Sequence, residues 1–225
     1  MKGKLILVEG TDCSGKETQT KKIIERLSSD NINCIRYCFP NYESPTGKII
    51  GGPYLGKEYI CSGWFDEGAS NVDPKVSSLY YGADFLYNIG KINEELNKGN
   101  NVILDRYFYS SFAHQGGKML DKDERLKMYK WLEKLEFELL ELPDADLKIF
   151  LHMPYDVAEE LRRNRKEKLD QNESSKEHLI NAENAYIEVA DLYKFKTIEC
   201  SCDNKARSID DINDELYNYI ISNLK

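Results

Sequence analysis

The chain has 225 residues, 41% of them hydrophobic, which suffices for one α/β domain that buries roughly 70% of its unfolded surface. Its formal net charge of −8 argues against general binding to a nucleic-acid backbone. No apolar run approaches the roughly 20 residues of a membrane span, and the six cysteines include no CxxC pair, so a cytoplasmic protein with free thiols is expected.

A short apolar run at residues 5–8 leads into a glycine-bracketed loop and then into a helix with an apolar face. Gly10 precedes the Gly15-Lys16 pair by the spacing at which backbone N–H groups surround a phosphate, and Lys16 adds charge for the outer phosphates. A glycine-rich turn without a ligand is the alternative. The residues of the predicted phosphate loop are Gly10, Thr11, Asp12, Cys13, Ser14, Gly15, Lys16, Glu17 and Thr18.

Strands and helices are predicted to alternate along the rest of the chain. The patterns predict strands over 32–39, 101–105, 147–151 and 195–200, and helices over 73–96, 121–142, 155–168, 176–192 and 209–224. Residues 41–73 are expected to be irregular and anchored by Trp64 and Phe65, and a polar loop is expected up to Lys118. Such alternation predicts a parallel sheet with helices on both faces.

Ligands of such sheets bind beyond the carboxyl ends of the strands. That edge would gather Glu9-Gly10, Phe39-Pro40, Asp105-Arg106 and the residues after Cys200. Asp105 is placed to hold Mg²⁺ directly or through water, and Arg106 to stabilise phosphate oxygens. A structural ion pair between Asp105 and Arg106 is the alternative.

Residues 105–115 have the sequence Asp-Arg-Tyr-Phe-Tyr-Ser-Ser-Phe-Ala-His-Gln, which resembles the signature of thymidylate kinases, a family of P-loop nucleoside monophosphate kinases. The phosphate loop, Phe39-Pro40, the segment 81–84 and Pro143-Asp144 resemble further parts of that pattern, and the match extends to about Ala190. The resemblance implies a three-layer P-loop kinase fold with a five-stranded parallel sheet. It also implies a single domain over residues 1–225 with a short lid at about 162–176.

The resemblance implies ATP- and Mg²⁺-dependent phosphorylation of a nucleoside monophosphate, with conversion of dTMP to dTDP for dTTP biosynthesis as the leading hypothesis. It implies a cytoplasmic homodimer whose partner is the nucleotide substrate, with neither nucleic acid nor membrane involved. Two alternatives stay open. One is a kinase of another deoxynucleotide or of a deoxynucleoside on the same fold, and the other is a non-catalytic, nucleotide-binding regulatory module.

Carried over position by position, the resemblance implies roles for individual residues. Catalysis would use Lys16, Asp105 and Arg106, together with a lid arginine, Arg162, Arg163 or Arg165, because Cys13 stands where other members have a catalytic arginine in the loop. Glu17 replaces the usual hydroxyl, and we expect its carboxylate, or Thr18, to hold Mg²⁺ with Asp105. The residues expected to contact the acceptor are Asp12, Phe39, Pro40, Tyr81, Asp84, Arg106, Ser110, Ser111, His114 and Gln115.

The acceptor site departs from the family pattern at several positions. Asn41-Tyr42 and Phe85 stand where the family often has arginines that contact the acceptor. His114 stands where an aromatic residue, often tyrosine, helps to exclude a ribose 2′-hydroxyl. Because of these departures, an acceptor that carries less phosphate remains an alternative. Arg36 and Lys48 are candidates to supply the positive charge of the missing arginines.

Overall fold

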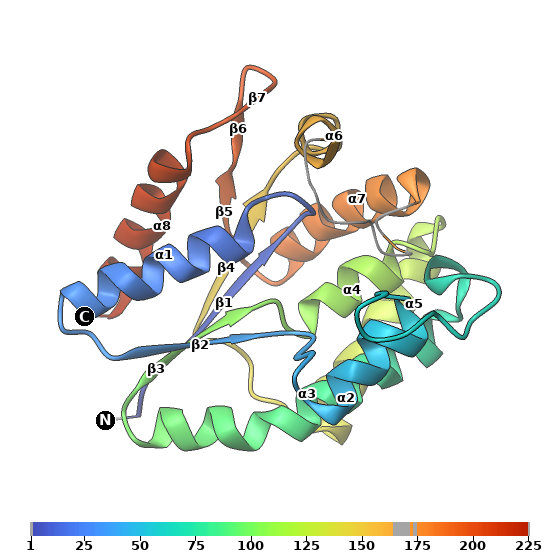
Figure 1. The fold of residues 1–225 in the computed structure, drawn as a ribbon, viewed down its shortest axis with the longest axis horizontal. Coiled ribbons are helices and arrows are strands. Elements are labelled where there is room, and N and C mark those ends of the chain that lie inside the picture. The colour runs from blue at the N-terminus through green and yellow to red at the C-terminus, as the bar shows by residue number, and fades with distance from the viewer. Residues whose placement is uncertain (1, 164–171, 173–174, 225) are drawn as a thin grey trace.

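The structure is a computed structural model that describes residues 2–163, 172 and 175–224. Within these residues, a five-stranded parallel sheet with strand order β2-β3-β1-β4-β5 has helices on both faces (Figure 1). The predicted fold class is thus confirmed, although most of the predicted lid lies outside the described residues. The strands of the sheet are β1 (Leu5–Gly10), β2 (Cys34–Cys38), β3 (Asn101–Asp105), β4 (Leu147–His152) and β5 (Lys196–Glu199).

The predicted helices are present within the described residues, although residues 164–168 of the helix predicted over 155–168 lie outside them, and the side chains of Asp73, Asp121 and Ser175 cap three of the starts. The Asp73 carboxylate accepts hydrogen bonds from the N–H groups of Lys75 and Val76, and Asp121 caps the next long helix in the same way. None of the described helices is long and apolar enough to cross a membrane. The helices are α1 (Lys16–Ser29), α2 (Pro45–Ile49), α3 (Pro74–Asn97), α4 (Tyr109–Gly116), α5 (Lys122–Glu133), α6 (Tyr155–Arg163), α7 (Lys176–Leu192) and α8 (Ile209–Leu224).

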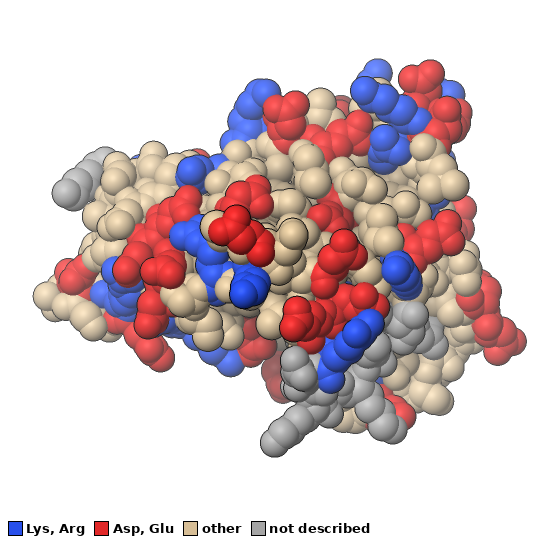
Figure 2. Space-filling model, turned by 90° about the horizontal axis from the view of Figure 1, so that it is seen from above, with Lys and Arg blue, Asp and Glu red and all other residues tan. Residues whose placement is uncertain are grey.

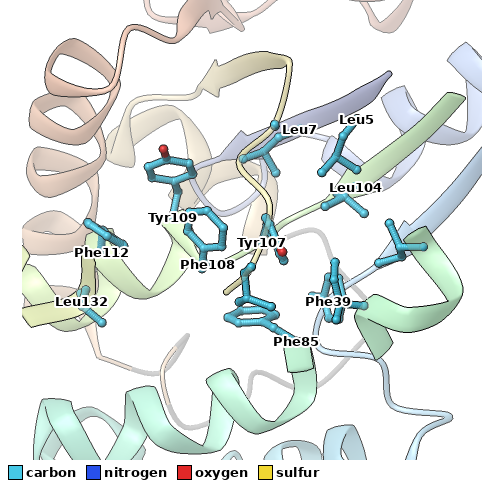
Figure 3. Packing of buried hydrophobic residues seen from close by; sticks show 14 of the residues in the cluster. Leu5, Leu7, Phe39, Phe85, Leu104, Tyr107, Phe108, Tyr109, Phe112 and Leu132 are labelled. Carbon is cyan, nitrogen blue, oxygen red and sulfur yellow. The ribbon is translucent and has the colours of Figure 1, made fainter. Parts of the chain in front are cut away.

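Alternate residues of the strands face two separate cores. Leu5 and Leu7 pack on the side of α3, α4 and α5, where Figure 3 shows a cluster of aromatic rings that includes Tyr107 and Phe108. Ile6 and Val8 face the other side, which α1 and α8 cover. Because these central strands are buried on both faces, their sequences are continuous apolar runs rather than alternating patterns.

Two segments expected to lack regular structure contain helices, and a hairpin follows β5. Residues 41–73 form α2, a π-helical segment at Ile50–Tyr54 and a 3₁₀ turn at Ala69–Asn71, and α4 occupies most of the predicted loop up to Lys118. Phe65 packs against Tyr54, as expected of an anchor, but Trp64 is 74% exposed. The hairpin consists of β6 (Ser201–Cys202) and β7 (Lys205–Ala206).

The predicted helix over 121–142 changes its geometry halfway. It is α-helical to Glu133 and π-helical over Lys134–Leu139, which turns Leu139 outward to 66% exposure. The same segment buries Glu136 completely, and neither of its carboxylate oxygens has a hydrogen-bond partner in the described part of the chain. Burial raises the pKa of Glu136 to about 8.

Candidate active site

A cavity of about 1290 Å³ lies at the C-terminal ends of β1, β2 and β3. It brings together most of the site residues predicted from the sequence. The residues after Cys200, which were expected at the same edge, are not among the described residues that line it. The predicted residues that do line it are Asp12, Cys13, Gly15, Lys16, Glu17, Thr18, Phe39, Pro40, Tyr81, Asp105, Arg106, Ser110, Ser111, His114 and Gln115.

The phosphate loop requires its two glycines for different reasons. At Gly10, a Cβ atom would stand 2.7 Å from the backbone oxygen of Leu151, so the loop could not approach β4 this closely. Gly15 has φ +78°, a left-handed conformation that side chains disfavour, and it begins α1 without a side-chain cap. The first N–H groups of α1 are therefore left for an anion. The Thr11 hydroxyl donates to the Met153 carbonyl at 2.8 Å and fastens the loop to the end of β4.

The side chain of Lys16 bends back onto the phosphate loop. Its ammonium donates to the carbonyl oxygens of Gly10 and Thr11 at 2.9 and 2.8 Å, and the residue is only 8% exposed. Burial, followed by the positive charge of Arg106, lowers the pKa of Lys16 to about 8. A phosphate group in the loop would stabilise the ammonium and raise this pKa again.

We therefore expect nucleotide binding to take up protons near pH 8. The free protein has lost part of its Lys16 protons at that pH, and a bound phosphate restores them. Calorimetric titration with ATP in buffers of different ionisation enthalpy measures the uptake directly, and the uptake should vanish about two pH units lower. Equal heats in all buffers at pH 8 would contradict this assignment.

Asp105, at the end of β3, lies between groups from two other elements. Arg36 on β2 donates to its carboxylate at 2.5 Å, and the Thr20 hydroxyl of α1 lies 3.3 Å away. Arg36 also donates to Thr20 at 2.8 Å. The ion pair considered from the sequence, between Asp105 and Arg106, is thus not the one formed, because Asp105 pairs with Arg36.

Arg106 has φ +67°, a strained backbone conformation that directs its guanidinium across the phosphate loop. It donates to the Asp12 carboxylate and to the Tyr186 hydroxyl, both at 2.8 Å. Burial acts to raise the pKa of Asp12, but the charges of Arg106 and Lys16 prevail and hold it well below its ordinary value. Asp12 is therefore an anion that fixes Arg106 beside the phosphate loop.

Glu9, which is 1% exposed, organises the turn after β3. Its carboxylate accepts from the N–H groups of Tyr107 and Ser110 at 2.9 and 3.0 Å and from the Ser110 hydroxyl at 2.7 Å. Tyr186 on α7 completes this network, since its hydroxyl lies 3.2 Å from the same carboxylate. Ser110 lines the cavity, but its hydroxyl is already committed to Glu9.

Two residues of the cavity wall each contain a buried polar atom that has no partner within the described part of the chain. The Ser111 hydroxyl and the Gln115 Oε1 atom are buried and have no hydrogen-bond partner within the described residues. Both residues line the cavity beside Tyr81. A buried polar atom without a partner costs about 1–3 kcal/mol, so a polar ligand group that reached these atoms would stabilise them.

Two histidines connect this wall of the cavity to α7. His114 Nδ1 lies 3.2 Å from His178 Nε2, and the two rings are stacked with centroids 5.4 Å apart. Burial and the neighbouring charges of His178 and Arg106 lower the pKa of His114 well below its usual value. His114 is therefore a neutral hydrogen-bonding group on the cavity wall.

Several predicted residues are not brought to the cavity. Asp84 is fully buried, and its carboxylate instead accepts from the Asn41 N–H and from the hydroxyls of Ser44 and Thr46. Arg162 lies over the Tyr155 ring and does not line the cavity. Arg165 lies outside the described residues.

The predicted magnesium ligand Glu17 lines the cavity, but its side chain is 69% exposed and pairs with Lys21 at 2.6 Å. Thr18, the other candidate, is exposed on the same first turn of α1. Of the predicted magnesium ligands, Asp105 is therefore the one that is buried at the end of a strand.

Three supporting residues of the site, Glu9, Arg36 and Tyr186, do not belong to the motifs that predicted the rest. Arg36 places a positive charge in the middle of β2. The sequence suggested this residue only as a substitute for an arginine that the family pattern has and this chain lacks. The sequence predicted the correct edge of the sheet for Glu9 but indicated no role for it. Tyr186 carried no signal, because its contacts depend on how α7 packs against α4.

Comparisons with known proteins show what this chain is similar to. A family model described as thymidylate kinase matches residues 8–212. The thymidylate kinase of Schizosaccharomyces pombe is 32% identical over 157 residues, which make up 70% of this chain but only 64% of that protein, slightly less than two thirds of it. That of Dictyostelium discoideum is 26% identical over 227 residues, covering 100% of this chain and 87% of the relative. The solved structure of thymidylate kinase from Candida albicans, an enzyme described as having broad substrate specificity, has a TM-score of 0.75 and 26% identity, covering 99% of this chain and 92% of that one.

Proposed function

The chain belongs to the thymidylate kinase family, and from this premise we propose that it transfers the terminal phosphoryl group of ATP to a nucleoside monophosphate, converting dTMP to dTDP for dTTP synthesis. One observation carries the proposal. Lys16 of the phosphate loop, Arg106, Ser111 and Gln115 all line one cavity, and the last two each contain a buried polar atom without a partner among the described residues. That arrangement suits two nucleotides with their phosphates between them, and positioning with charge neutralisation is most of what phosphoryl transfer requires.

We propose that Mg²⁺ is bound on the Asp105 side of the cavity. Protein Mg²⁺ sites commonly use one or two carboxylates, with water and substrate phosphates as the other ligands. No group of three His, Cys, Asp or Glu side chains that could hold a metal occurs within the described ranges, so a site here would depend on the nucleotide's own phosphates. Asp105, with the Thr20 hydroxyl beside it, fits that role. Bound there, the ion would neutralise charge on the transferring phosphoryl group.

The experiment that tests the proposal is coupled ADP release with ATP and Mg²⁺ across a panel of nucleoside monophosphates and free nucleosides. Preference for dTMP is the expected result. Turnover with a different acceptor alone would keep the reaction and overturn the specificity. Tight ATP binding without transfer to any acceptor would overturn the kinase proposal and favour a nucleotide-binding regulatory module.

We further propose a homodimer formed through α3. Exposed apolar residues recur along this helix at spacings of three and four, which places Val76, Leu79, Ala83 and Leu86 on one face. Val76, Leu79 and Leu86 are 41%, 54% and 49% exposed, respectively. An apolar stripe of this length on a surface helix indicates an interaction site.

Replacing both Leu79 and Leu86 with lysine should convert a dimer to a monomer, because each lysine would bury a charge in the interface. Sedimentation velocity measures the mass directly. Ile187→Lys, which changes an equally exposed apolar residue on α7, should leave the mass unchanged. A dimer that survives the double substitution would place the interface elsewhere.

We propose that the protein acts in the cytoplasm and binds neither nucleic acid nor membrane. All six cysteines are free thiols, as a reducing compartment would keep them. Figure 2 shows acidic and basic side chains interspersed over the face that it draws. Interspersed charges of this kind, with the net charge of −8, do not favour a polyanionic partner.

A further inference from the structure

The segment that follows β2 forms one wall of the cavity, and it continues directly into α2. The Ser44 N–H donates to the Asn41 carbonyl at 2.8 Å and so turns the chain into the helix. At Gly47 of α2, a Cβ atom would stand 1.9 Å from the same carbonyl oxygen, so α2 packs directly on this segment. The residues of this wall segment, all of which line the cavity, are Phe39, Pro40, Asn41, Tyr42 and Glu43.

The wall segment and α2 are held from outside by α3. The helix α2 has only five residues, too few to be stable by itself in water, and it lies against α3 (Figure 1). Asp84 of α3 is fully buried, and its carboxylate accepts from the Asn41 N–H at 2.8 Å. The hydroxyls of Ser44 and Thr46 donate to the same carboxylate at 2.8 and 2.7 Å. One side chain therefore fixes the wall segment and the start of α2 together.

Asn88, one turn further along α3, extends this network to the cavity. Its amide group donates to the Asp84 carboxylate at 2.9 Å, and its amide oxygen accepts from the Asn41 side chain at 2.8 Å. Asn41 and Asn88 line the cavity, whereas Asp84 is not among the described residues that do so. Asp84 therefore lies behind the wall and acts on the cavity only through its neighbours.

A different set of hydrogen bonds holds the phosphate loop. The Thr11 hydroxyl joins the loop to Met153, and the Lys16 ammonium bonds two carbonyl groups of the loop itself. The Asp84 carboxylate bonds only to groups of the wall segment, α2 and α3. A change at Asp84 should therefore alter one wall of the cavity and leave the phosphate loop as it is.

We infer that Asp84 is a positioning residue for the acceptor nucleotide, because it holds the wall segment in the shape that the acceptor binds. The inference rests on the proposed function, in which the phosphate loop holds the donor through its phosphates. The acceptor then lies against walls that the phosphate loop does not form, and the wall segment is one of them. The sequence predicted a direct contact between Asp84 and the acceptor, and the structure gives this residue an indirect role in the same site.

Calorimetric titrations with dTMP alone, and with ATP and Mg²⁺ alone, test the inference. They give two Kd values for the wild type and for Asp84→Ala, Asp84→Asn, Thr46→Val and Ser78→Ala. Thr46→Val removes one donor to the carboxylate and keeps the shape of the side chain. Ser78→Ala is the matched control, because Ser78 is a fully buried polar residue of the same helix that donates to the Pro74 carbonyl and does not line the cavity.

We expect Asp84→Ala to raise the dTMP Kd about tenfold or more, since a displacement of about 1 Å in a positioning group is enough for such a loss. The ATP Kd should stay as in the wild type. Asp84→Asn should keep most of the dTMP affinity, because its amide oxygen can still accept from the Asn41 N–H and the hydroxyls can accept as well as donate. Thr46→Val should weaken dTMP in the same direction but by less, and Ser78→Ala should change neither Kd.

An unchanged dTMP Kd in Asp84→Ala, or equal weakening of both nucleotides, would overturn the inference. Should Asp84→Ala fail to fold, as circular dichroism would show, an unchanged dTMP Kd in Thr46→Val would overturn it instead. Coupled ADP release on the same proteins separates the two proposals. Selective weakening of dTMP without wild-type turnover would overturn only the kinase reaction, and wild-type turnover with an unchanged dTMP Kd in Asp84→Ala only the role of Asp84. A wild type that does not bind dTMP would overturn both.

Discussion

Lys16→Met is expected to reduce turnover by a factor of about 100 to 1000 or more, the usual cost of removing one preorganised charge from a transition state. Methionine occupies nearly the same slot but cannot donate a hydrogen bond to the phosphates. The carbonyl oxygens of Gly10 and Thr11 would also lose the ammonium group that donates hydrogen bonds to them. Steady-state ADP release measures the loss, and far-UV circular dichroism shows whether the variant is folded.

The matched control for this variant is Lys21→Met. Lys21 lies on the same helix, is 59% exposed and pairs with Glu17 on the surface. Its loss should leave turnover within about twofold, since exposed ion pairs contribute little. If Lys16→Met retained more than a tenth of wild-type turnover, the loop would not be the donor site.

Glu136→Met is expected to stabilise the protein by an amount that grows with pH. The ordinary pKa of this carboxyl is 4.5, and burial raises it to about 8 in the folded state. Between these values the unfolded chain releases a proton that the folded chain retains, so the wild type loses stability as pH rises through this window and is constant above it. The difference of about 3.5 pKa units sets a limit of about 5 kcal/mol on the effect.

Urea unfolding at several values between about pH 5 and pH 8 tests this expectation. The slope of unfolding free energy against pH should become flatter in Glu136→Met and stay as in the wild type in Glu138→Met, which changes an exposed glutamate of the same π-helical segment. Parallel slopes for all three proteins would mean that Glu136 is not held protonated in the folded state.

The parts of the site that the sequence predicts are those in which consecutive residues act together. The phosphate loop needs glycines at two positions, a lysine and a helix start, all within nine residues, and Gly10 and Gly15 each meet a local requirement in the structure. Asp105 and Arg106 follow a strand directly, so their place at the sheet edge follows from the topology. Neither inference needs knowledge of distant contacts.

Parts of the site that depend on packing between distant segments could not be predicted. Asp84 belongs to a recognisable motif on α3. Whether its side chain reaches the cavity depends on the turn around Ser44, because the Ser44 hydroxyl donates a hydrogen bond to the Asp84 carboxylate. The sequence of α4 predicted a loop. The helix could not be recognised from the sequence, because its stability comes from burying Phe112 and Ala113 rather than from its own periodicity.

The internal bonds of Lys16, Arg36 and Arg106 have a consequence for how the protein behaves among the small anions of a cell. Each of these cations already has a carbonyl or carboxylate partner before any nucleotide arrives. An incoming phosphate therefore has to displace a partner that is already in place, and its net gain is smaller than its contacts suggest. Free orthophosphate can replace few of these bonds at once, whereas a triphosphate can replace several from one molecule. We expect millimolar inorganic phosphate to compete only weakly with nucleotides for this site.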